Sequence, residues 1–215
     1  MNHIEDLCHL TAGLDWITIK SSNVNAVVNA LELENIHQGR VGKFKDKVIR
    51  QRGVGHFEDK TNTFVFSAQH DWIIIIHDWR PGRVSKKYLN VMEQIVTELS
   101  QKFGEAQSFG VCEYFDYWIH HEDIVDYAHW ILARNGVLIR SFTKASETMN
   151  DFHTSQFRNF GEVTEAESFI NWTDAELFPR MPEIIQLSQK WSTEPIFSNH
   201  PGDVVGVLGY KHLQL

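Results

Sequence analysis

The sequence predicts an α+β domain, with a mainly antiparallel sheet of about six strands covered by two principal helices. Three segments carry this prediction. Asn135-Gly136, between two apolar runs, is a strong local signal for a β-hairpin. Four consecutive isoleucines, Ile73 to Ile76, are β-branched and apolar on both faces, which is typical of a central strand. Apolar residues recur at helical spacing across 85–103, which predicts a long amphipathic helix.

The N-terminal part predicts a strand, a helix and a long loop in succession. Residues 16–21 alternate with a period of two, as in a half-buried strand. Residues 22–36 begin with a capping serine and carry valine and leucine at mostly helical spacing. The segment 37–60 mixes glycine with charged residues without a sustained period, so we expect a loop. Two adjacent strands should follow, at 63–67 and 72–77.

The long helix should end at Gly104, because glycine suits the residue that follows a helix. Its apolar stripe should lie on the sheet. Two further strands are expected at 106–112 and 114–120.

The C-terminal part gives weaker signals. We expect residues 1–215 to form a single domain, of which 146–215 is a looser part. The segment 146–180 has no clear period, and 182–191 predicts a short helix. The tail after Pro195 is expected to be irregular.

The hairpin signal also predicts which side chains share a face. With a two-residue turn at Asn135-Gly136, the expected pairs are Arg134 with Val137, Leu132 with Ile139, Trp130 with Ser141 and Ala128 with Thr143. The core face would then comprise Ala128, Trp130, Leu132, Val137 and Ile139. The opposite face would carry Tyr127, His129, Ile131, Leu138, Arg140 and Phe142.

The second of these faces supplies the candidate binding residues. Tyr127, His129, Arg140 and Phe142 offer aromatic, titratable and cationic groups on a rigid hairpin, which suits another protein or a small anion. His129 and Arg140 are expected to lie diagonally across the two strands, so a small-molecule enzyme using them within 125–144 is an alternative. A further alternative is structural: helices would cover this face, and both residues would pair with buried carboxylates.

Other chemical signatures are weak. The ligand types at His120, His121, Asp123, Asp126 and His129 would suit a metal ion. However, adjacent histidines on a strand point to opposite faces, so the set converges only if the backbone turns. No phosphate-binding glycine loop and no GxSxG nucleophile motif occurs in the sequence. We therefore expect no cofactor, no metal and no catalytic residue.

Composition limits the partners and the location. Twenty basic and 28 acidic residues give a formal charge of −8, which opposes general attraction to nucleic acid or anionic lipid. The most apolar run, 72–76, is far shorter than the roughly 20 residues that cross a bilayer. The N-terminus lacks the cationic and apolar parts of a secretion signal. We expect a cytoplasmic protein with neither a nucleic-acid partner nor a membrane partner.

Six segments resemble a family of uncharacterised bacterial proteins. They are DWIII at 71–75, LSQKFGEAQSF at 99–109, YAHW at 127–130, GVLIR at 136–140, KWSTEP at 190–195 and GVLG at 206–209. Members of such families occur beside secreted bacterial toxins, so the resemblance implies a non-enzymatic immunity protein that binds and neutralises a cognate toxin. His129, Trp130 and Arg140 lie in the matching motifs, but the resemblance assigns no functional role to any residue.

Overall fold

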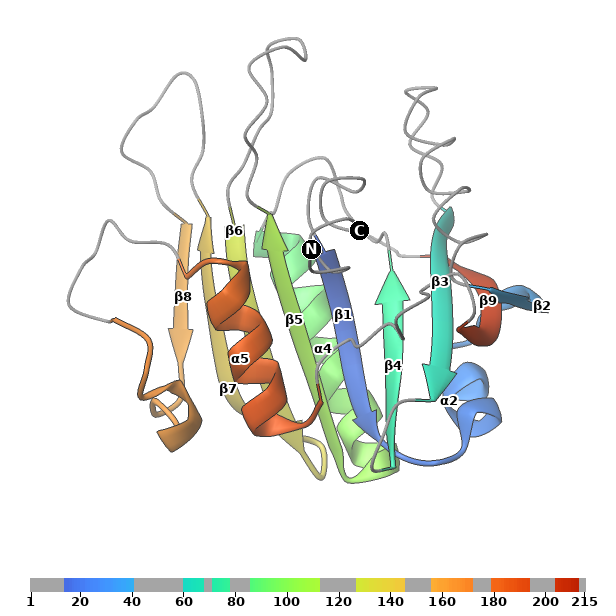
Figure 1. Ribbon diagram of the computed structural model, residues 1–215, viewed down its shortest axis with the longest axis horizontal. Helices are drawn as coiled ribbons and strands as arrows, with labels where there is room; N and C mark the ends of the chain where they lie inside the picture. Colours follow the sequence, from blue (N-terminus) through green and yellow to red (C-terminus); the bar gives the residue numbers. More distant parts are fainter. Residues whose placement is uncertain are drawn as a thin grey trace, which may run out of the picture.

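One antiparallel sheet of nine strands organises the described part of the protein (Figure 1). The computed structural model describes residues 14–40, 60–67, 71–77, 86–112, 127–145, 156–171, 179–193 and 204–212. Its strands are β1 (Leu14–Lys20), β2 (Glu34–Arg40), β3 (Lys60–Ser67), β4 (Trp72–His77), β5 (Glu105–Cys112), β6 (Tyr127–Arg134), β7 (Val137–Ala145), β8 (Gln156–Phe160) and β9 (Val205–His212). Its helices are α2 (Val24–Ala30), α4 (Lys86–Phe103) and α5 (Met181–Trp191), with a 3-10 turn, η1 (Glu165–Glu167). The α+β class and the antiparallel sheet are confirmed, and the sheet exceeds the six strands expected.

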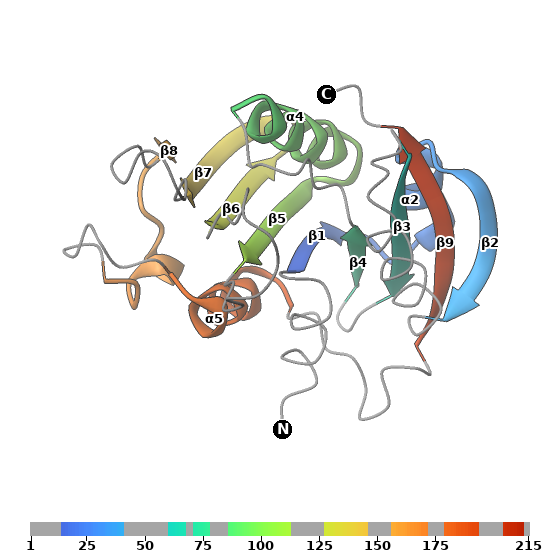
Figure 2. The same ribbon diagram turned by 90° about the horizontal axis from the view of Figure 1, so that it is seen from above.

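The sheet separates two layers of helices. Its strands lie in the order β2-β9-β3-β4-β1-β5-β6-β7-β8, and all neighbouring pairs are antiparallel. Helices α2 and α4 lie on one face and α5 lies on the other (Figure 2). We call these the α4 face and the α5 face. Each face has its own hydrophobic core, because side chains alternate between the two faces of a strand.

The isoleucine strand is central, as predicted. β4 lies between β3 and β1. Ile73 and Ile75 are buried in the core of the α4 face, whereas Ile74 and Ile76 are buried in the core of the α5 face. A strand with cover on both faces can be continuously apolar, which explains why this segment shows no alternation.

The long helix also follows the prediction. Tyr88, Met92, Val96 and Leu99 lie along one side of α4 and are buried against the sheet. The helix ends at Phe103, and the following Gly104 has a φ of 88°, in the left-handed region that glycine adopts without strain. The predicted stripe and its C-terminal stop are therefore confirmed.

The tail after Pro195 is not irregular throughout, because it contains β9, which pairs with both β2 and β3. Two glycines explain why the sequence pattern did not predict this strand. A side chain at Gly206 would overlap the Val65 carbonyl oxygen, and one at Gly209 would lie 2.9 Å from Leu33 Cβ. Glycine at these positions permits the close approach of neighbouring segments of the sheet. It also interrupts the alternation of apolar and polar residues by which strands are recognised in a sequence.

Two more strands were not predicted, β2 and β8. The helix expected over 22–36 ends at Ala30, and Glu32 has a φ of 55°, which a helix cannot continue through. β2 follows, and its side chains are exposed or half-buried, so no apolar alternation marks it. β8 lies at the other end of the sheet order, within a segment expected to be irregular. Edge strands that bury little of either face carry little apolar pattern.

The expected strand at 114–120 and most of the expected loop at 37–60 lie outside the described residues. In the part of the chain that is described, no helix is long and apolar enough to cross a membrane.

The hairpin turn between β6 and β7 has the predicted type I′ character, because Asn135 and Gly136 have φ values of 48° and 78°. The turn packs on the end of α4, where the Ser100 hydroxyl accepts a hydrogen bond from the Gly136 amide at 3.0 Å. We expect Gly136→Ala to lower the free energy of unfolding by about 1 kcal/mol, measured by urea denaturation, because alanine is strained at this φ.

Asn135→Gly is the control for this prediction, since glycine accepts the same positive φ and should change stability by only a few tenths of a kcal/mol. Equal losses for the two variants would contradict the assignment of the strain to Gly136.

Candidate functional site

A β-bulge changes the face on which two of the four candidate residues lie. Arg134 pairs with Val137 as predicted, but Leu132 then pairs with Arg140, and Ile139 is the extra residue. Trp130 consequently pairs with Phe142. The register predicted beyond the turn is therefore wrong by one residue, and a shift of one residue moves side chains to the opposite face.

The four candidate residues consequently do not share a face. Tyr127 and His129 lie on the α4 face, whereas Arg140 and Phe142 lie on the α5 face beside Trp130. All four side chains are buried. The sheet itself separates His129 from Arg140, so the diagonal contact expected between them does not form. Whether any of the four binds a partner remains a prediction.

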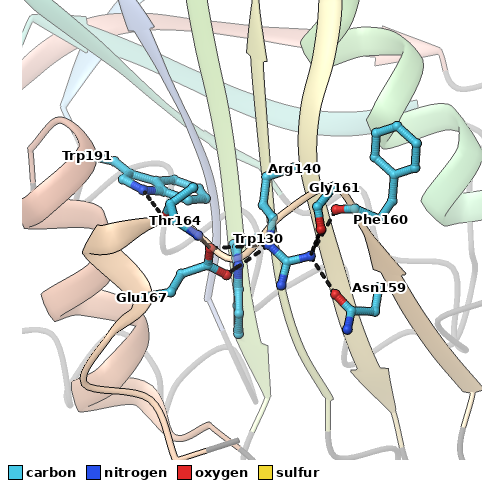
Figure 3. A network of polar contacts seen from close by, with 8 residues as sticks. All are labelled: Trp130, Arg140, Asn159, Phe160, Gly161, Thr164, Glu167 and Trp191. Carbon is cyan, nitrogen blue, oxygen red and sulfur yellow. Dashed lines mark hydrogen bonds and ion pairs between the residues drawn. The ribbon is translucent and has the colours of Figure 1, made fainter.

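Arg140 is the centre of a buried network on the α5 face (Figure 3). Its Nε donates to both carboxylate oxygens of Glu167, at 3.0 and 3.2 Å, and both side chains are 0% exposed. The same carboxylate accepts hydrogen bonds from Trp130 Nε1 and from the Thr164 amide, each at 2.7 Å. The glutamate charge is thus compensated by a cation and two further donors, which is what a buried carboxylate requires.

The other end of the guanidinium binds β8. Arg140 Nη1 donates to the Asn159 side chain and, at 2.8 Å, to the Phe160 carbonyl oxygen. At the far side of the network, Trp191 on α5 donates from its indole nitrogen to the Thr164 hydroxyl at 3.2 Å. One buried ion pair therefore joins β6, β7, β8, the η1 turn and α5.

A second buried cluster lies on the α4 face and contains His129 and Tyr127. The Tyr127 hydroxyl donates to both carboxylate oxygens of Asp15, at 2.6 and 2.7 Å. His129 Nδ1 lies 3.9 Å from Asp15 Oδ1, and its Nε2 lies 3.2 Å from the Ser108 hydroxyl. The rings of Tyr127 and His129 stack, with their centroids 5.9 Å apart.

Gly110 makes this second cluster possible. It lies in β5 between Asp15 of β1 and His129 of β6, in register with both. A Cβ at Gly110 would overlap the Asp15 carboxylate and the His129 ring. The absence of a side chain lets residues from two strands that are not neighbours meet across the strand between them.

The cluster is part of a polar row across the α4 face. Five side chains in register with one another, all of them buried, belong to it: Thr63, His77, Asp15, His129 and Thr143. Tyr88 of α4 meets the His129 ring edge-on. Asp15 and Ser108 were missed by the sequence analysis, although the period of two in the first strand places Asp15 with Ile17 and Ile19, on a face that must be buried.

The cluster of Asp15, His129 and Ser108 has the residue types of a Ser-His-Asp hydrolase, but its serine is not accessible. Ser108 is 0% exposed beneath α4, and a nucleophile must reach its substrate. The 3.9 Å between His129 and Asp15 is also longer than a hydrogen bond. The cluster as it stands is a buried polar network rather than a reaction centre.

Metal ligation finds no support among the described residues, where no three His, Cys, Asp or Glu side chains come together. His120, His121, Asp123 and Asp126 lie outside the described residues. His129, the remaining member of that predicted set, contacts Asp15, Ser108 and two tyrosine rings.

Apolar side chains are exposed on both faces of the sheet at the edge where β7 and β8 meet. Val137 lies opposite Arg134 on the α5 face, whereas Phe160 lies opposite Ser141 on the α4 face. Val137, Ile139, Phe160 and Val163 are 59%, 38%, 42% and 49% exposed, and we call them the edge patch. Val137 and Ile139 were expected in the core, so this part of the core prediction is wrong. Gly161 packs directly against the Ile139 carbonyl, so the backbones of the two strands lie close together at this edge.

Two arginines flank the edge patch, and each is paired with a glutamate. The Arg158 guanidinium lies over the Phe160 ring at 5.4 Å and binds Glu93 of α4 at 3.0 Å. Arg134 binds Glu105 at 2.9 Å. The cations beside the patch are therefore locally neutralised.

Comparisons with protein-family models, with curated proteins and with solved structures gave no match. The resemblance to bacterial immunity proteins therefore stays a prediction.

Proposed function

We propose that the protein is a non-enzymatic, cytoplasmic binding protein of the immunity type, which neutralises a cognate bacterial toxin by covering part of its surface. The observation that carries this proposal is the edge patch, in which four apolar side chains from β7, β8 and the segment after β8 are exposed along one edge of the sheet. Several apolar side chains that remain exposed at one edge of a folded protein are typical of interaction surfaces.

The composition of the patch supports a protein partner. Phe160 offers a large aromatic anchor, and an aromatic residue near the centre of an interface contributes much of the binding energy. Because Arg134 and Arg158 are paired with glutamates, they do not repel a basic partner from the patch. The net charge of −8 would speed association with such a partner.

The enzyme alternative has less support. His129 and Arg140 lie on opposite faces of the sheet, so they cannot act on one small molecule. In the described part of the chain, the titratable side chains nearest to them are already engaged in buried contacts: Asp15 with Tyr127, and Glu167 with Arg140.

The test uses the protein encoded directly beside this chain in its genome. We expect that neighbour to arrest growth when expressed alone in a bacterial host, and co-expression of this chain to restore growth with formation of a stoichiometric complex. Phe160→Ser should weaken the purified complex by about 2 kcal/mol, roughly 30-fold in Kd, measured by calorimetry.

The far edge of the sheet supplies matched controls. Val137→Ser is compared with Val205→Ser, because the two valines are 59% and 58% exposed, and Phe160→Ser is compared with Ile36→Ser, since Ile36 is 50% exposed. Only the two edge-patch variants should lose affinity. A neighbour that is harmless, or that is neutralised without binding, would refute the proposed function, and equal losses at both edges would refute the patch as the contact surface.

A further inference from the structure

We draw no further inference here: the strongest candidate, the buried cluster of Asp15, His129 and Ser108 between the sheet and α4, belongs to the polar network already described, and nothing in the described part of the chain shows what ligand could reach it.

Discussion

Glu167→Ala should lower the free energy of unfolding by about 3–5 kcal/mol, measured by chemical denaturation. The change leaves the Arg140 guanidinium buried beside an apolar core without its carboxylate, since both side chains are 0% exposed. Trp130 Nε1 and the Thr164 amide lose their acceptor at the same time. The loss is therefore dominated by groups left buried without compensation, rather than by the attraction between the two charges.

An exposed ion pair provides the control. Glu105→Ala removes the partner of Arg134, whose side chain is 53% exposed, and should cost about 1 kcal/mol or less. In addition, the double variant Arg140→Met with Glu167→Leu should recover much of the stability lost in Glu167→Ala, because no charge is then left buried. Similar losses for Glu167→Ala and Glu105→Ala would mean that solvent reaches the Arg140 site.

Gly110→Ala should lower the free energy of unfolding by about 3 kcal/mol, again by denaturation. The added methyl group would overlap the Asp15 carboxylate and the His129 ring at once. Both of those side chains are buried between the sheet and its cover, so neither can move aside without breaking a polar contact. The cost combines overpacking with the loss of hydrogen bonds to a buried carboxylate.

Gly39→Ala is the matched control in the edge strand β2. There the added methyl group meets mainly the end of the Leu208 side chain, which can change rotamer. Its cost should be about 1 kcal/mol or less. Equal losses of stability for Gly110→Ala and Gly39→Ala would contradict the inference that Gly110 is needed for the close approach of Asp15 to His129.

The strongest predictions from sequence came from segments whose patterns have a local cause. The isoleucine run at 73–76, the stripe of α4 and its stop at Gly104 each follow from burial or backbone geometry within a few residues, and each is confirmed. The strands that were missed lack such a cause. β2 is mostly exposed. β9 needs glycine at 206 and 209 because neighbouring segments of the same chain approach it closely there.

The candidate site shows the same division. The sequence alone determined the hairpin, its turn at Asn135-Gly136 and the pairing of Arg134 with Val137, because a type I′ turn depends on two residues. Only the tertiary structure decided on which face Arg140 lies and what it binds. The bulge at Ile139 lets Arg140 reach Glu167. Glu167 is brought near by β8 and η1 and not by the hairpin. A buried charge is stable only where a distant partner compensates it, so the face of Arg140 could not follow from the hairpin sequence.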